Sequence, residues 1–121
     1  MILADTSVWI DHIRQGDDLL FALLENQRIL THPYVIGEIA LGSLRSRAER
    51  LATLHDLPSV IPARHSEVMR LIESERLFGT GLGYVDAHLL TSAIAMDEVA
   101  IWSRDKKMVS HTARLNVAFE P

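Results

Sequence analysis

The stretch that decides the fold is MILADTSVWID, residues 1–11. An apolar run follows the first residue and ends at Asp5, and Thr6 and Ser7 then precede a second apolar run. A short apolar run with a polar boundary is typical of a buried strand, and Asp, Thr and Ser are typical of a helix start. Asp5 is therefore expected at the carboxyl end of a parallel strand, where open α/β sheets bind ligands. The alternative is that Asp5 or Thr6 only caps the helix.

The composition indicates one domain with a substantial apolar core, because the chain has 121 residues and 48% of them are hydrophobic. It contains no cysteine, which excludes a disulfide framework and fits a reducing compartment. We see no signal peptide at the start of the sequence, and no apolar run approaches the ~18 residues that a membrane span needs. We therefore expect a soluble, cytoplasmic protein with a single domain over residues 1–121.

Apolar runs alternate with helical patterns along the chain, which predicts a parallel sheet covered by helices on both faces. The expected strands lie at residues 2–4, 28–31, 58–62, 99–102 and 116–119. The expected helices lie at about residues 7–14, 17–24, 33–42, 46–55, 63–78 and 87–95, with a short basic helix after residue 105.

Three further acidic residues occupy unusual settings. Glu38 interrupts an otherwise apolar helix, Asp86 follows a glycine-rich loop, and Asp105 directly follows the fourth expected strand. Each has a simpler explanation: a partly exposed helix residue, a helix cap, or a loop acid paired with a neighbouring lysine. However, the first and fourth strands flank the switch point of the simplest doubly wound sheet. Asp5 and Asp105 should therefore project into one crevice.

A cluster of these acids would need protons or a cation. Two carboxylates about 4 Å apart repel each other by roughly 4 kcal/mol at an effective dielectric constant near 20. Ligands that are all oxygen favour magnesium or manganese over zinc, and magnesium would bind one or two carboxylates and keep several waters. Such a site suits hydrolysis of a phosphodiester. The net charge of −4 argues only against a protein that coats nucleic acid by bulk electrostatics.

At these residues the chain resembles the PIN-domain family, in particular the VapC-type toxins of bacterial toxin–antitoxin pairs. The matching segments are DTSVWID, EIALG, GTGLGYVDAHLLTSA and IWSRDKKM, in the same order over essentially the whole chain. The resemblance implies a three-layer α/β/α sandwich with a five-stranded parallel sheet and a ribonuclease that depends on Mg²⁺ or Mn²⁺. It also implies homodimers and inhibition by a small antitoxin, for which residues 19–24 and 41–44 offer apolar docking surface.

The resemblance also assigns roles to the acids by matching position. Asp5 and Asp86 are implied to be metal ligands, and Glu38 and Asp105 are implied to hold metal-bound water. Thr6 or Ser7 is then expected to cap the helix while Asp5 faces the ion. The supporting hydroxyls are those of Thr6, Ser7 and Ser103, the last at a position where threonine is more usual. The candidates for contacts with RNA phosphates are Arg45, Arg104, Lys106 and Lys107.

Two other enzyme or signalling classes fit the sequence less well. A receiver-type phosphoacceptor needs an aspartate just after the third strand, but Asp56 precedes the expected one. A phosphatase with an aspartyl nucleophile needs a second aspartate two residues after Asp5, and Ser7 stands there. The remaining alternative is a catalytically silent PIN-like module that only binds RNA or a protein.

Overall fold

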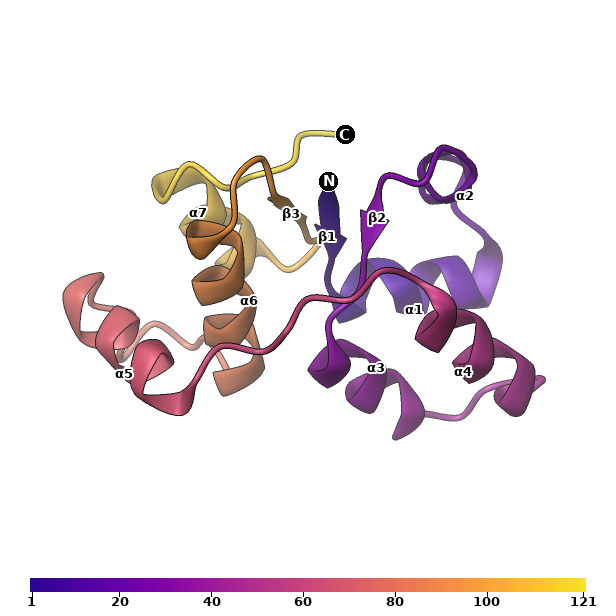
Figure 1. Ribbon diagram of the computed structural model, residues 1–121, viewed down its shortest axis with the longest axis horizontal. Helices are drawn as coiled ribbons and strands as arrows, with labels where there is room; N and C mark the ends of the chain where they lie inside the picture. Colours follow the sequence, from indigo (N-terminus) through magenta and orange to yellow (C-terminus); the bar gives the residue numbers. More distant parts are fainter.

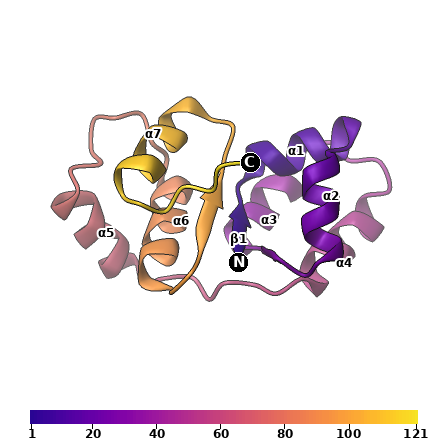
Figure 2. The ribbon, with the colours of Figure 1, turned by 90° about the horizontal axis from the view of Figure 1, so that it is seen from above.

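A computed structural model describes the whole chain, residues 1–121, as a short parallel sheet with helices on both sides (Figure 1). The sheet has the order β2-β1-β3, with β1 at Ile2–Ala4, β2 at Ile29–Leu30 and β3 at Ala100–Trp102. In two perpendicular views, α1 to α4 lie on one side of the sheet and α5 to α7 on the other (Figures 1 and 2). The predicted α/β class with a parallel sheet is thus confirmed.

The helices follow the predicted pattern with shifted ends. They are α1 Thr6–Gln15, α2 Asp18–Glu25, α3 Pro33–Ala40, α4 Arg47–Asp56, α5 His65–Ser74, α6 Tyr84–Ala95 and α7 Lys106–Arg114. The largest error is at α5, which was expected to reach residue 78. Arg76 has a φ of 53°, so the chain leaves the helical conformation soon after Ser74. No helix combines the length and apolar character that crossing a membrane requires.

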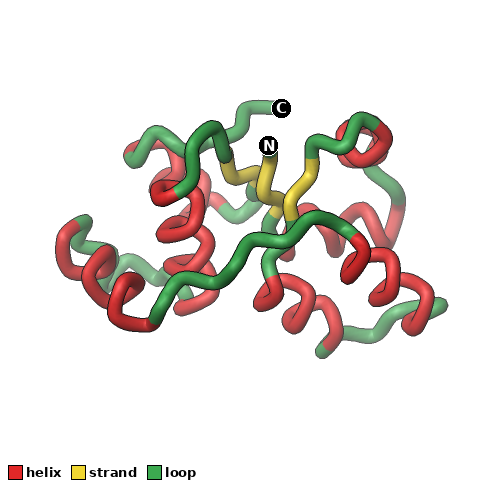
Figure 3. Tube along the Cα trace, in the orientation of Figure 1, coloured by secondary structure: helices red, strands yellow, loops and turns green.

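The prediction of five strands is wrong, because the two outer segments pair with the sheet through single bridges. These bridges join Thr31 to Ser59 and Ile101 to Ala118. Prolines at positions 58 and 62 have no N–H to donate to a longer ladder, and the segment remains a loop between α4 and α5 (Figure 3). On the other edge, Asn116 has a φ of 60°, so extended pairing with β3 begins only at Val117.

The core lies around β1 and α6. All three residues of β1 are buried, as is most of α6 from its second turn onward. Trp9 and Trp102 are 4% and 3% exposed, so both belong to the core. Burial of β1 from both sides explains why its sequence is a continuous apolar run rather than an alternating one.

The register of β1 and β3 positions the candidate site. Ala4 pairs with Trp102, and the backbone N–H of Asp5 donates to the carbonyl oxygen of Trp102 at 3.0 Å. The residues that follow both strands therefore begin side by side, as the doubly wound order predicted. Asp5 and Ser103 leave the sheet at the same edge.

Candidate active site

Asp5 is both the N-cap of α1 and the most buried of the four acids. Its Oδ1 accepts hydrogen bonds from the Val8 backbone N–H at 3.3 Å and from the Ser7 hydroxyl at 2.5 Å, and the residue is 4% exposed. The expectation that Thr6 or Ser7 would cap the helix instead is therefore wrong. Both bonds go to one carboxylate oxygen, so a single side chain can cap the helix and still offer Oδ2 to a ligand.

Two serines connect Asp5 to the segment after β3. The Ser7 hydroxyl accepts a hydrogen bond from the Arg104 backbone N–H at 3.0 Å, and the Ser103 hydroxyl accepts one from the Asp105 N–H at 3.0 Å. Burial raises the pKa of the Asp5 carboxyl, and hydrogen bonds from Ser103 and Ser7 partly offset this. The supporting hydroxyls thus hold the Asp5 carboxylate in place and favour its charged form.

Glu38 approaches the same region from α3. Its Oε1 accepts a hydrogen bond from the Thr6 hydroxyl at 2.7 Å, which ties α3 to the first turn of α1. Glu38 is exposed, so this bond and its place on the helix are what orient its carboxylate. Thr6 therefore acts on Glu38 rather than on the helix cap.

Asp86 and Asp105 occupy the first turns of two further helices. Asp86 lies in the first turn of α6, where its Oδ2 accepts from the Gly83 N–H at 3.2 Å. Asp105 is the N-cap of α7, and its Oδ1 accepts from the Lys107 N–H at 2.9 Å. Backbone N–H groups at helix N-termini stabilise negative charge. The simpler explanations therefore need correction: Asp86 lies in the first turn rather than at the cap, and Asp105 is a helix cap that forms no salt bridge with a neighbouring lysine.

The negative charges of the other three acids act on Asp86. Burial is the main reason that the pKa of Asp86 is raised, and the negative charges of Asp5, Asp105 and Glu38 raise it further. The three salt bridges of the chain use Asp11, Asp17 and Glu75, so none neutralises this cluster. The four predicted acids therefore contribute to one electrostatic centre, and none of them forms a salt bridge.

The donor set of this centre fits a hard divalent cation. All of its donors are carboxylate or hydroxyl oxygens, which suit Mg²⁺ or Mn²⁺. No three of the carboxylates come close enough to enclose an ion by themselves. A magnesium ion that keeps several waters needs only one or two direct carboxylate ligands, so the arrangement remains compatible with one.

The four basic residues proposed to contact RNA have different surroundings. The Arg104 guanidinium pairs with Asp11 at 2.6 Å and with Asp17, and it lies 5.5 Å from the centre of the Trp102 ring. Phosphate would have to compete with two carboxylates for it. Arg45, Lys106 and Lys107 are exposed.

The Lys107 side chain packs over the glycine-rich loop that precedes Asp86. A Cβ built on Gly81 would lie 2.9 Å from the Lys107 Nζ, and Gly81 has a φ of +88°. The positive φ favours glycine at this position, whereas the flexible end of the lysine could move aside. The loop and α7 are therefore in direct contact beside the acidic centre.

An aromatic cluster next to the acids was missed from the sequence, in which the six histidines look scattered. The cluster consists of His32, Tyr34, His65, Tyr84 and His88, whose neighbouring rings lie 4.7–6.0 Å apart. One signal was available: Tyr84 and His88 are four residues apart and therefore share a face of α6. The contacts with His32, Tyr34 and His65 depend on tertiary packing, so no local pattern in the sequence indicates them.

His32 is expected to make stability depend on pH. Its ring is fully buried, and burial, followed by the charge of His88, lowers its pKa from 6.5 to about 4. Above pH 6.5 the imidazole is neutral in both folded and unfolded chains. As the pH falls towards 4 the unfolded chain takes up the proton first, so stability is lost across this window. The loss should reach roughly 3 kcal/mol and level off at lower pH.

His32→Asn tests this prediction. The His32 Nδ1 accepts from the Tyr34 N–H at 3.0 Å as the N-cap of α3, and asparagine is an equally good cap that does not titrate. Urea unfolding of both proteins near neutral pH and near pH 4 should show a smaller loss of stability in the variant. His55→Asn, at an exposed histidine, is the control and should lose as much as the wild type. An equal pH response of His32→Asn and wild type would contradict the prediction.

Comparison with known proteins agrees with the motifs and the fold. Residues 2–115 match the family model described as the PIN domain. Ribonuclease VapC32 of Mycobacterium tuberculosis (strain CDC 1551 / Oshkosh) is 45% identical to the chain over 121 residues, which cover 98% of this chain and 95% of the relative. Ribonuclease VapC32 of Mycobacterium tuberculosis (strain ATCC 25618 / H37Rv) gives the same values. The chain therefore belongs to the PIN-domain family, as the resemblance of its four acidic motifs predicted.

Proposed function

We propose that this chain is an endoribonuclease that depends on Mg²⁺ or Mn²⁺ and acts as the toxin of a toxin–antitoxin pair. The observation that carries the proposal is the acidic centre of Asp5, Glu38, Asp86 and Asp105, whose charges raise the pKa of Asp86 and have no salt-bridge partner. The similarity to a protein named as a ribonuclease supports the choice of RNA as substrate.

The four carboxylates have two different proposed roles. Asp5 and Asp86 are the proposed metal ligands because they are the least exposed of the four acids. When bound, the ion offsets charge on the phosphodiester and makes water a better nucleophile. Glu38 and Asp105 each have one carboxylate oxygen held by a hydrogen bond. The other oxygen can orient the attacking water and accept a proton from it.

The proposed partners are a cognate antitoxin and a second copy of the chain. For the antitoxin, Phe21 on α2 is 58% exposed and Leu41 after α3 is 90% exposed. A nearby cavity of about 300 Å³ is lined by residues of α1, α2 and α4, including Trp9 and Leu24. These surfaces support the docking regions expected at residues 19–24 and 41–44, because an amphipathic helix binds by inserting apolar side chains into such a groove. Homodimer formation is a family expectation that we include in the proposal.

The test is cleavage of structured RNAs by the purified chain, with Mg²⁺ and with a chelator. We expect cutting only with the metal ion, and products with 5′-phosphate and 3′-hydroxyl ends, because water rather than the RNA 2′-hydroxyl attacks. Cutting without metal, or cyclic phosphate ends, would contradict the proposed mechanism. Binding of RNA without cutting under any condition would favour the catalytically silent module.

A further inference from the structure

Two partly exposed tyrosines of the aromatic cluster are held against one buried histidine. Tyr34 and Tyr84 are 40% and 43% exposed, whereas His88 is 2% exposed. Both tyrosine ring centres lie 4.7 Å from that of His88, at interplanar angles of 79° and 85°. Such edge-to-face contacts fix a ring while part of its surface remains accessible. The two phenol rings are therefore positioned before any ligand arrives.

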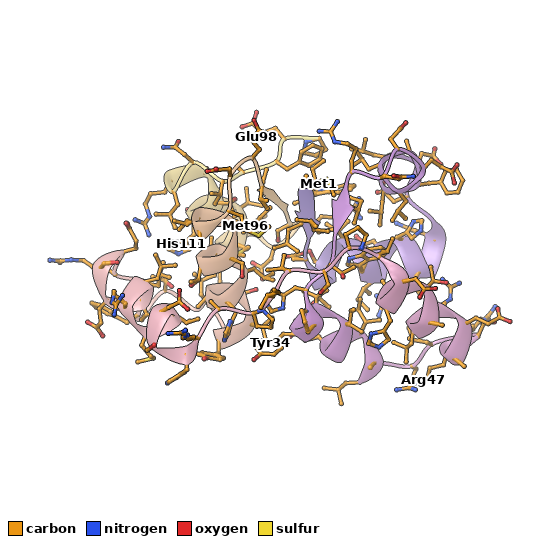
Figure 4. All side chains as sticks on the ribbon, in the orientation of Figure 1. Met1, Tyr34, Arg47, Met96, Glu98 and His111 are labelled. Atoms are coloured by element: carbon orange, nitrogen blue, oxygen red, sulfur yellow. The ribbon has the colours of Figure 1, made fainter.

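The same two tyrosines border the acidic centre. Tyr34 lies four residues before Glu38 on α3, so the two side chains share a helix face. Tyr84 is the first residue of α6, and its ring packs on the same His88 as that of Tyr34. Figure 4 shows Tyr34 where α3 faces α6, which agrees with its ring contact to His88 on α6. The two rings therefore meet at His88, beside the face of α3 that carries Glu38.

Contacts with phosphate are one source of RNA affinity at this site, and aromatic stacking is a second. The chain has a net charge of −4, and the Arg104 guanidinium is already paired with Asp11 and Asp17. Phosphate contacts usually dominate the affinity of nucleic-acid-binding proteins. Where they are weak, stacking of unpaired bases on aromatic rings can supply affinity with little dependence on sequence.

We propose that Tyr34 and Tyr84 form a stacking site for unpaired RNA bases beside the scissile phosphate. This inference rests on the proposed ribonuclease function and names the feature of RNA that the site recognises. A base paired in a duplex presents no free face to these rings, so cleavage is directed to single-stranded loops and ends. The neighbouring histidines position the tyrosines: the His65 Nδ1 lies 2.6 Å from the Tyr84 hydroxyl, and the His32 ring lies 5.0 Å from that of Tyr34.

The first test measures binding and does not depend on catalysis. The chain contains only two tyrosines, so labelling of tyrosine rings gives an NMR spectrum that reports on this site alone. The probes are 5′-AMP and ribose 5-phosphate, which differ only by the base, each added to the wild-type chain with Mg²⁺. We expect 5′-AMP to shift the tyrosine signals and ribose 5-phosphate to leave them nearly unchanged. Equal shifts from both probes, or none from 5′-AMP, would overturn the proposal.

The second test uses the kinetics of the structured RNA that is cut in the test of function. Tyr34→Ala and Tyr84→Ala are each expected to raise KM about 10-fold with a smaller change in kcat, and Tyr→Phe at either position to restore most of the loss. Phe78→Ala is the matched control, because it removes an exposed aromatic ring from the segment after α5 and should leave KM unchanged. If Tyr84→Phe is as impaired as Tyr84→Ala, the hydroxyl contact with His65 rather than stacking explains the effect, and the proposal fails.

The two proposals can fail separately. If cutting depends on metal but is unchanged by substitution of either tyrosine, the stacking site is contradicted and the ribonuclease function is supported. If 5′-AMP shifts the tyrosine signals but the chain cuts no RNA, the ribonuclease function is contradicted and a base-binding site is supported. Circular dichroism of each variant checks that it folds, and the phenylalanine variants retain the ring that packs on His88.

Discussion

Asp5→Asn is expected to lower RNA cleavage by about 100- to 1,000-fold while the chain keeps its fold and nearly its wild-type melting temperature. The loss in rate follows from removing the charge of a proposed metal ligand at the reacting phosphate. The fold survives because asparagine is as good an N-cap as aspartate, and its side-chain oxygen can still accept from Val8 and Ser7. The measurements are initial cleavage rates with Mg²⁺ and thermal unfolding by circular dichroism.

Two further variants separate catalysis from capping. Asp5→Ala loses both the charge and the cap, so it should be equally inactive and also less stable by about 1 kcal/mol. Asp18→Asn removes an exposed aspartate in the first turn of α2 and should change neither rate nor stability appreciably. Wild-type cleavage by Asp5→Asn would remove Asp5 from the proposed mechanism. Unfolding of Asp5→Asn would show that its charge is needed for structure.

The sequence predicted the acidic centre because its geometry follows from short-range rules. An apolar run of strand length that ends in an acid occurs at both Asp5 and Asp105, and parallel strands place their carboxyl ends together. The pairing of Ala4 with Trp102 is the single long-range fact needed to join them. Glu38 was detectable as a charge within an apolar helix, and Asp86 as an acid after a glycine-rich loop.

Other features depend on tertiary contacts that no local pattern encodes. The two expected edge strands form only single bridges with the sheet, because prolines and the conformation of Asn116 limit pairing. The two ion pairs of Arg104 join residues 87 or more positions apart in sequence. The five rings of the aromatic cluster come from three separate helices and the residue before one of them. In each case the sequence contains the residues, but no local pattern indicates which other residues they contact.

The acids also show why structural and functional interpretations need not compete. Asp5, Asp86 and Asp105 each accept a hydrogen bond from a helix N-terminal region, and for Asp5 this is the cap that the simpler explanation predicted. The same backbone N–H groups stabilise the negative charges of these carboxylates, which otherwise repel one another. Helix starts therefore allow carboxylates to stay charged near one another until a cation binds.

Asp86→Asn is expected to make the metal-free chain more stable and to abolish cleavage together with stabilisation by Mg²⁺. The pKa of Asp86 is raised by burial and by three neighbouring charges, so its ionised form at pH 7 costs folding free energy. This penalty is absent below the unfolded-state pKa of 3.8 and appears as the pH rises through the raised folded-state pKa. Asparagine is neutral at all these values and can still accept from the Gly83 N–H.

Thermal unfolding with a chelator and with excess Mg²⁺ measures both effects. A ligand at 100 times its Kd stabilises the folded state by about 2.7 kcal/mol, so the wild-type melting temperature should rise with Mg²⁺ and that of Asp86→Asn should not. Asp97→Asn, at an exposed aspartate just beyond α6, is the control and should respond to Mg²⁺ like the wild type. A less stable metal-free Asp86→Asn would mean that its charge is already balanced in the folded chain. Equal stabilisation of Asp86→Asn and wild type by Mg²⁺ would place the ion elsewhere.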